Sequence, residues 1–231
     1  MTFALSPKIS FELRRIGREK QPLLIVDHVL DDPGALVAMA ANADYYVPDH
    51  THYPGVNANV PEAYYQPLLA GLRAPLEKAF GVPQRAGLDY FGFFALATRE
   101  ARAAEPIQKI PHHDSPEPGR LALVHYLCRG PFGGTGFFRH KATGFESIDA
   151  GRHEGYVALA RAELDRGGAV ATYAGEDMAD YEMIDYAELV FNRLIIYRSH
   201  VLHSGLLGAA PLPDDPSTGR LTANGFIQAR L

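Results

Sequence analysis

Short apolar runs separated by turn residues dominate the hydrophobic pattern of this chain, and helical spacing is confined to a few stretches. In residues 64–80 apolar positions recur every three or four residues, and Gly81 is placed to end that helix. An earlier helix is expected to begin at Asp31 or Asp32, because either side chain can cap it and Pro33 suits its first turn. The N-terminal part therefore predicts strands at 11–18 and 23–29, helices from Asp32 and at 64–80, and a long loop at 45–61.

The rest of the chain carries mainly β signals. The expected strands lie at residues 88–98, 106–113, 121–128, 135–139, 189–197 and 221–228. Turn compositions such as Gly-Pro-Phe-Gly-Gly at 130–134 separate them and favour antiparallel pairing. Residues 141–188 interrupt the series, with an expected helix at 156–164 and short segments at 170–173 and 181–184. Short strands with such turns are typical of a sandwich or barrel, and the preceding helices would cover one outer face.

Length and composition fit a single domain of residues 1–231, with an N-terminal support at 1–86 and a β core at 87–231. The net charge is −5 and the basic residues are scattered, so nucleic acid is not an expected partner. A lone cysteine, Cys128, excludes an internal disulfide. No stretch approaches about 18 uninterrupted apolar residues and no secretory signal opens the chain, so we expect a cytoplasmic protein with no membrane partner.

The stretch Ile-Pro-His-His-Asp at 110–114 offers candidate metal ligands. If it ends a strand, His112 and Asp114 point to one face and His113 to the other, because side chains alternate along a strand. Two histidines and one carboxylate can hold a first-row metal ion and leave three coordination positions open. The His-x-Asp pair alone is also common in solvated loops, so the interpretation depends on a further histidine downstream.

A later apolar run supplies two such histidines, His200 and His203. Their spacing places them on opposite faces of a strand, so only one can join the site. Further on, Arg220 and Thr222 share a face at the start of the last expected strand. A guanidinium buried on an interior face requires an anionic partner, and a dicarboxylate held by its fork would meet that requirement.

These motifs in this order resemble the 2-oxoglutarate and iron(II)-dependent oxygenase superfamily, in particular its prolyl-hydroxylase-like branch and an uncharacterised bacterial group within it. The resemblance covers roughly residues 88–231. It implies a mainly β fold with flanking helices: a double-stranded β-helix of the jelly-roll or cupin-like type, buttressed by N-terminal helices. It makes His112, Asp114 and His203 the iron ligands, because His-Ser-Gly at a strand end matches the family, and leaves His200 as a partly solvated neighbour.

The resemblance also implies a site for the cosubstrate 2-oxoglutarate. Arg220 would bind its distal carboxylate, Tyr126 would support the same carboxylate, and Thr222 would be the hydroxyl residue that follows the arginine in the family pattern. Arg220 lies 17 positions after His203, a longer spacing than the family usually shows, and the proline-rich stretch at 211–216 can absorb the excess.

The implied function is therefore a non-haem Fe(II), 2-oxoglutarate-dependent dioxygenase that hydroxylates or otherwise oxidises a peptide, amino acid or small molecule. Hydroxylation is favoured over halogenation because Asp114 leaves no ligand position for a halide. The loop at 45–61 and the insertion at 141–188 are the candidate lids. Two alternatives remain open: a cupin-like metalloenzyme that does not use 2-oxoglutarate, and a non-catalytic barrel that serves as a binding module. A homodimer also remains open.

Overall fold

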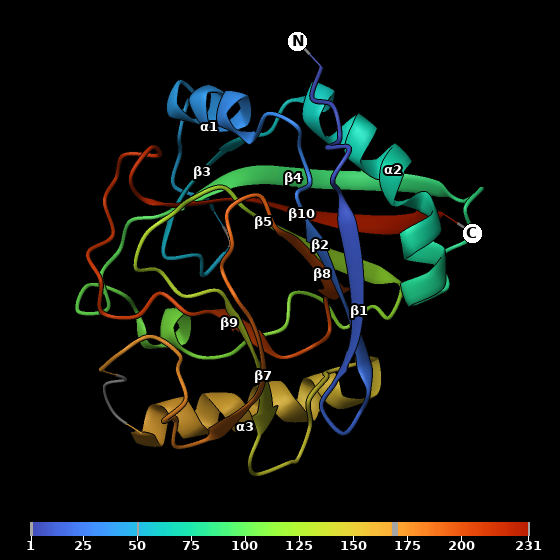
Figure 1. Cartoon of the computed structure of the whole chain (residues 1–231). Helices are drawn as coiled ribbons and strands as arrows, with labels where there is room; N and C mark the ends of the chain where they lie inside the picture. Colours follow the sequence, from blue (N-terminus) through green and yellow to red (C-terminus); the bar gives the residue numbers. More distant parts are fainter. Residues whose placement is uncertain (1, 50, 168–170, 231) are drawn as a thin grey trace.

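The computed structural model of the chain describes residues 2–49, 51–167 and 171–230 (Figure 1). The strands are β1 (Ser10–Ile16), β2 (Gln21–Asp27), β3 (Gly55–Asn59), β4 (Gly87–Ala97), β5 (Arg120–Tyr126), β6 (Thr135–His140), β7 (Tyr181–Ala187), β8 (Leu194–Arg198), β9 (His203–Gly205) and β10 (Arg220–Arg230). The helices are α1 (Pro33–Ala41), α2 (Glu62–Phe80), α3 (Ala150–Gly167) and the short 3₁₀ helix η1 (Pro106–Lys109). A mainly β chain with flanking helices, as predicted, is confirmed.

The strands form two antiparallel sheets. The large sheet has the order β1-β2-β8-β5-β10-β4-β3, and the small sheet has the order β7-β6-β9. Neighbours in the centre of the large sheet are distant in sequence: β5 pairs with both β8 and β10, and β10 pairs with β4. The N-terminal strands β1, β2 and β3 extend the two edges of this sheet. The division into a single domain with an N-terminal support stays a prediction.

Each face of the large sheet is covered by a different layer, which explains why its central strands are apolar on both sides. On β8, Leu194 and Ile196 point towards α1 and α2, whereas Ile195 and Tyr197 point towards the small sheet. The small sheet contributes Phe137 to the same inner cluster. The inner faces of the two sheets therefore pack against each other, and side chains from both enclose the candidate site.

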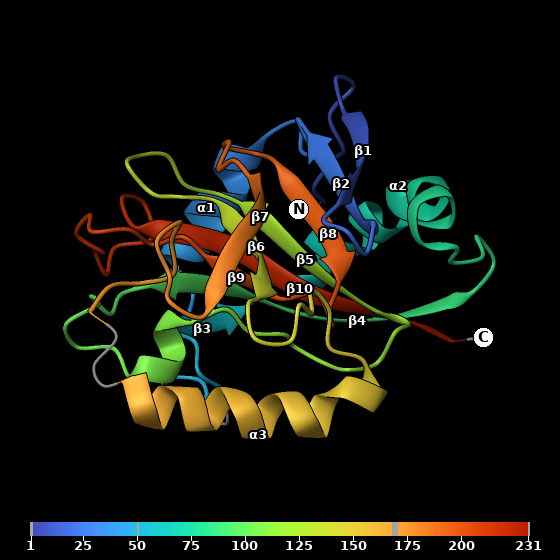
Figure 2. The ribbon, with the colours of Figure 1, turned by 90° about the horizontal axis from the view of Figure 1, so that it is seen from below.

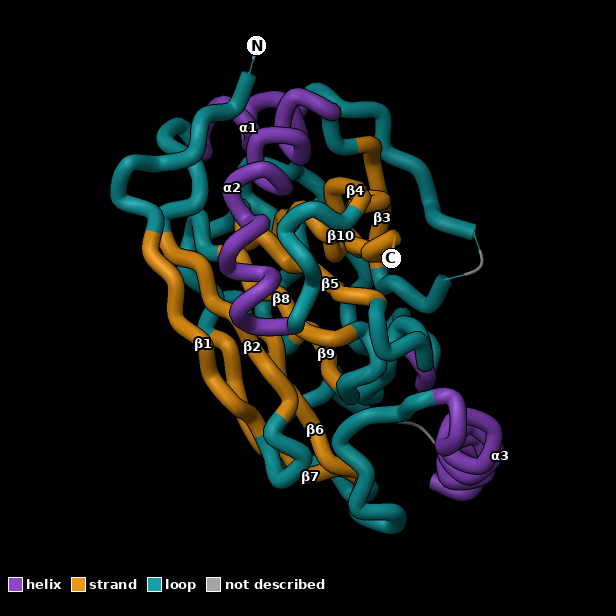
Figure 3. Tube along the Cα trace, turned by 90° about the vertical axis from the view of Figure 1, so that its right-hand side faces the viewer, coloured by secondary structure: helices purple, strands orange, loops and turns teal. Residues whose placement is uncertain are grey.

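The helices cover opposite sides of the sheets (Figures 1 and 3). On α2 the buried side chains follow helical spacing, with Tyr64, Leu68, Leu72 and Leu76 one turn apart, and the helix ends at Gly81 with a left-handed φ of 74°. Figure 2 shows α3 along the lower edge of the view, apart from α1 and α2. There Tyr156 packs into one cluster with residues of β6 and β7. Within the described ranges no helix is both long and apolar enough to cross a membrane.

Three predicted elements differ from the structure. The strand expected at 106–113 is wrong: Pro106 begins η1, in which the side chain of Gln108 bonds back to the Glu105 backbone, and only His112 forms a bridge to a strand. The loop expected at 45–61 contains β3, because its second half pairs with β4. The interruption at 141–188 is only partly an insertion, because β7 belongs to the small sheet.

The segment expected at 170–173 falls partly outside the described residues, since residue 170 is not among them, and residues 171–173 are irregular. The expected helix at 156–164 and the short segment at 181–184 are both longer in the structure, as α3 and β7. Propensity located these elements, while their ends were set by packing between segments that are far apart in the sequence.

Candidate functional site

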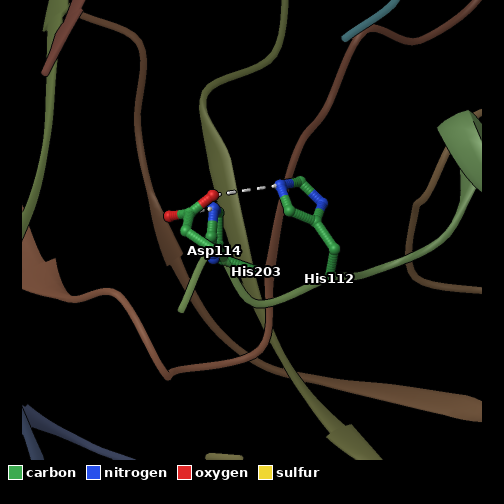
Figure 4. A group of neighbouring side chains, drawn as sticks. All are labelled: His112, Asp114 and His203. Atoms are coloured by element: carbon green, nitrogen blue, oxygen red, sulfur yellow. Dashed lines mark ion pairs between the residues drawn. The ribbon is translucent and has the colours of Figure 1, made fainter. Parts of the chain in front are cut away.

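His112, Asp114 and His203 meet at one point (Figure 4). One nitrogen from each ring and one carboxylate oxygen lie within 4.8 Å of one another. The Nε2 atom of His112 is 3.7 Å from Oδ1 of Asp114, and Nε2 of His203 is 3.6 Å from Oδ2 of the same carboxylate. Two imidazoles and one carboxylate are the donor types that can hold a first-row metal ion and leave coordination positions open. The assignment of these three residues as metal ligands stays a prediction.

Backbone hydrogen bonds hold the three residues in place. His112 and His203 exchange N–H···O bonds of 2.9 and 2.8 Å, which form an isolated antiparallel bridge. The Asp114 N–H donates to the Ser199 carbonyl at 2.8 Å. The segment 112–114 therefore runs alongside residues 199–203. Only His112 forms a strand-like bridge. Because these bonds extend the segment, His112 and Asp114 point to one side and His113 to the other, as expected for a strand end, although the segment is not a strand.

A hydrogen bond to the backbone sets the tautomer of His203. Its Nδ1 lies 2.9 Å from the Val201 carbonyl, and a carbonyl can only accept, so Nδ1 carries the proton. In a neutral ring this leaves the lone pair on Nε2, the atom that faces Asp114. The ring also packs edge-on against the buried Tyr197, with the two ring centroids 4.7 Å apart. His203 is thus oriented as a metal-binding histidine usually is, through its second nitrogen.

The open side of the site is at His112. Its side chain is 54% exposed, whereas that of Asp114 is 19% exposed. Although solvent reaches the ring, the protein around it reduces its hydration and lowers the pKa of His112 to about 4, and the nearby His203 ring acts in the same direction. His112 is therefore neutral at physiological pH, the form in which an imidazole can donate a lone pair to a metal.

His113 points away from the site. Its Nε2 lies 3.0 Å from Nδ1 of His153 on α3, and its ring also contacts Tyr156 edge-on. Burial lowers the pKa of His113 to about 4, and the His153 ring adds to that effect. This residue links the loop to α3 and offers no atom to the group formed by the other three.

The structure separates the two candidate histidines of the later run. His203 joins the site, while His200 lies outside it with its carbonyl accepting from the Ile148 N–H at 2.7 Å. The expectation that His200 is partly solvated is wrong: it is 6% exposed. Neither of its ring nitrogens has a hydrogen-bond partner among the described residues. The turn between β8 and β9 is bonded to residues 146–148, and this packing buries the His200 ring.

We expect His203→Leu, but not His200→Leu, to change the metal site. The visible spectrum of the cobalt(II)-loaded protein reports coordination number and ligand type, so loss of the His203 nitrogen should alter band positions and intensities. His200→Leu replaces an unpartnered ring by an apolar side chain and should leave the spectrum unchanged. The opposite pattern would transfer the ligand role to His200.

Arg220 lies on the inner side of the sheets, against Gly205 of β9, two residues after His203. It is 4% exposed, and its Nε and Nη2 donate to the carbonyls of Gly133 and Gly134 at 3.2 and 3.1 Å. No Asp or Glu in the described part of the chain forms an ion pair with it. A guanidinium has five N–H donors, so two carbonyls fix its orientation and leave three donors, mostly on Nη1. A buried cation with free donors and no acidic partner is suited to bind an anion.

Gly205 on β9 lies directly against the guanidinium of Arg220. A Cβ atom built at Gly205 would lie 3.4 Å from Nη2 of Arg220, which is van der Waals contact. Gly205 stands directly opposite Thr135 of β6, and the hydroxyls of Thr135 and Tyr126 share a hydrogen bond of 2.7 Å. Burial raises the pKa of Tyr126 to about 12, while Thr135 and the charge of Arg220 act in the opposite direction. Arg220, Tyr126 and Thr135 thus belong to one polar group.

Thr222 shares the inner face with Arg220 and stands opposite Tyr126 in the sheet. Its buried hydroxyl donates to the Ala95 carbonyl on β4 at 3.4 Å. The Thr222 hydroxyl can therefore still accept a hydrogen bond, but its only proton is already donated to Ala95. The roles of Arg220, Tyr126 and Thr222 in binding a cosubstrate remain predictions.

Reasoning from the sequence missed Thr135, Gly205 and Tyr197 as parts of the site. In the sequence, Thr135 only begins an expected strand and Gly205 only ends the His-Ser-Gly run, and nothing in either pattern shows that the two residues face each other. Tyr197 was expected only as a member of the apolar strand at 189–197. All three are identified by the pairing of strands that are distant in sequence.

Comparisons with known proteins show a family and a fold. Residues 7–227 match the model of a family described as "Family of unknown function (DUF6445)". No curated protein matches the sequence significantly. Among solved structures, HygX from Streptomyces hygroscopicus with nickel, 2-oxoglutarate and hygromycin B bound aligns with a TM-score of 0.50 and 13% identity over 93% of this chain and 87% of that chain. A Pseudomonas putida prolyl-4-hydroxylase aligns with a TM-score of 0.44 and 15% identity over 96% and 93%.

Proposed function

The chain belongs to the DUF6445 family, and we propose from its site that it is a non-haem Fe(II), 2-oxoglutarate-dependent dioxygenase. The substrate would be a small molecule, amino acid or peptide that is hydroxylated or otherwise oxidised. One observation carries this proposal: a buried arginine with free donors and no acidic partner in the described residues lies beside the strand that holds a potential metal ligand.

The distance along β9 supports a two-ended ligand. His203 and Gly205 are two residues apart, so they face the same side, and two residues of strand span about 6.6 Å. The first carries the nitrogen for the metal, and the second lies against the guanidinium of Arg220. A short dicarboxylate with a chelating 2-oxo acid at one end could therefore reach both. A metal ion alone would leave Arg220 without its anion.

The metal would be held by His112, Asp114 and His203, with three positions left for the 2-oxo acid and oxygen. When bound, iron and 2-oxoglutarate supply the oxidation: one atom of oxygen enters the substrate, the other enters succinate, and carbon dioxide is released. The chain itself contributes two imidazole nitrogens, a fixed carboxylate and a buried cation, and the aromatic rings of Tyr197 and Phe137 keep water from the inner side.

The arrangement of the sheets is consistent with this activity. We propose that the two facing antiparallel sheets form the double-stranded β-helix, with β5 interleaved between β8 and β10 as in a jelly roll. The HygX complex is similar in fold, and its ligands are nickel, 2-oxoglutarate and hygromycin B. The cupin-like alternative without 2-oxoglutarate predicts an Asp or Glu partner for Arg220, and the described residues supply none at ion-pair distance.

Anaerobic binding tests this function directly. Addition of 2-oxoglutarate to the Fe(II)-loaded protein should produce the weak visible charge-transfer band of bidentate chelation. Pyruvate, which has the same chelating end but no distal carboxylate, should bind much more weakly, because Arg220 gains nothing from it. Equal binding of the two acids, or no band with either, would contradict the proposal and favour the cupin-like alternative.

A further inference from the structure

The segment ahead of β3 brings a buried hydroxyl into the neighbourhood of Arg220. The Tyr53 hydroxyl is buried and has no hydrogen-bond partner among the described residues. Its side chain packs into a cluster with Ala97 of β4 and with Leu207 and Leu212 of the loop that leads to Arg220. An unpaired buried hydroxyl costs free energy, and a bound ligand with a hydrogen-bond acceptor in reach would remove that cost.

Strand register places this tyrosine next to the anion-binding end of the site. Gly55 pairs with Ala97, and Ala97 pairs in turn with Arg220. Tyr53 lies two residues before Gly55, and its carbonyl accepts from the Gly55 N–H at 3.0 Å. The Gln108 amide also donates to that carbonyl, at 3.4 Å. The backbone of Tyr53 is thus fixed beside the three paired residues Gly55, Ala97 and Arg220.

Electrostatics agrees with this placement. Burial raises the pKa of Tyr53 well above its usual value, and among the charges around it the guanidinium of Arg220 opposes that rise. The phenol stays protonated at physiological pH and is therefore a hydrogen-bond donor. Arg220 retains free donors at the same end of the site, since its carbonyl partners occupy only Nε and one proton of Nη2.

We propose that the Tyr53 hydroxyl donates a hydrogen bond to the same carboxylate that Arg220 holds, so that the segment before β3 completes the cosubstrate site. This inference rests on the proposed function. A phenol and a guanidinium converging on one carboxylate would select a dicarboxylate over a monocarboxylate, because both donors are satisfied only when the distal group is present.

The unpaired hydroxyl gives the proposal a distinctive signature. In the protein without 2-oxoglutarate, Tyr53→Phe removes a polar group that has no partner, so the melting temperature should stay equal or rise. In the complex the same change removes a hydrogen bond to a charged group, so affinity should fall by about tenfold or more. A hydroxyl with a purely structural role would instead lower the melting temperature when removed.

Tyr45→Phe is the matched control. The Tyr45 hydroxyl is also buried without a partner among the described residues, and burial raises the pKa of Tyr45 to about 12. Its ring, however, packs with the cluster on the helix side of the large sheet. Removal of this hydroxyl should leave 2-oxoglutarate binding unchanged.

The experiment is calorimetric titration of 2-oxoglutarate into the anaerobic Fe(II)-loaded protein, together with thermal melting of each variant without the ligand. Weaker binding by Tyr53→Phe alone, with no loss of melting temperature, is the expected result. Unchanged affinity in Tyr53→Phe, a lowered melting temperature in that variant, or an equal loss in Tyr45→Phe would overturn the inference while the proposed function stands. Failure of the unmodified protein to bind 2-oxoglutarate would overturn both.

Discussion

Asp114→Ala should abolish tight iron binding. Asp114 is the only anionic member of the group, and its two carboxylate oxygens face the Nε2 atoms of His112 and His203 at 3.7 and 3.6 Å. Without it the ion would meet two neutral ligands only. Alteration of an outer partner of a metal ligand already costs about 10- to 100-fold in affinity, so loss of the ligand itself should cost more than about 100-fold. Metal analysis after anaerobic loading and gel filtration measures this directly.

His113→Ala provides the control for that variant. The residue adjoins Asp114 in sequence, but its ring bonds to His153 and contacts Tyr156 instead of the site. This change should retain one iron per chain. Retention of iron by Asp114→Ala together with loss by His113→Ala would mean that the loop is turned by one residue and that the ligand set is misassigned.

Arg220→Ala should have the second large effect, confined to 2-oxoglutarate. The change removes a buried, charge-assisted fork, a loss of about 2 to 5 kcal/mol, which corresponds to a drop in affinity of about 30-fold or more. Tyr126→Phe removes one hydrogen bond to a charged group, about 1.5 to 3 kcal/mol at most, and should weaken binding less. Iron content should remain unchanged in both variants, since neither residue belongs to the metal group.

Arg198→Ala is the matched control for Arg220→Ala. Arg198 also donates to two carbonyls, those of Pro118 and Phe80, at 2.5 and 3.2 Å. It lies at the end of β8, and its two carbonyl partners differ from the Gly133 and Gly134 carbonyls that orient Arg220. Its loss should not affect 2-oxoglutarate binding. Binding that ignores Arg220→Ala, or that responds equally to Arg198→Ala, would show that the guanidinium of Arg220 does not hold the carboxylate.

Much of the fold could be predicted because local patterns and tertiary packing agree. The apolar runs that form β2 and β8 are buried on both faces, and the helical spacing of α2 matches the side that contacts the large sheet. The prediction failed at residues 106–113. Apolar residues there suggested a strand, but Pro106 and the Glu105–Gln108 capping interaction favour a turn of 3₁₀ helix, and the chain extends only at His112.

The sequence by itself determined which functional groups are available: a His-x-Asp pair, two later histidines, and an arginine with a threonine two residues later at the start of the last strand. Spacing within one strand is a local property, so it could show which of these side chains share a face. Strand alternation also showed that His200 and His203 cannot both belong to one site.

Only the tertiary structure decided which groups meet. It joined His203 with His112, set the His203 tautomer through Val201, and placed Gly205 and Thr135 beside Arg220. It also left Arg220 without an acidic partner in the described part of the chain. These contacts join segments separated by many residues, and no periodicity records which segments will pair. Hydrogen-bond register between strands, together with packing of the two sheets, fixes them in space.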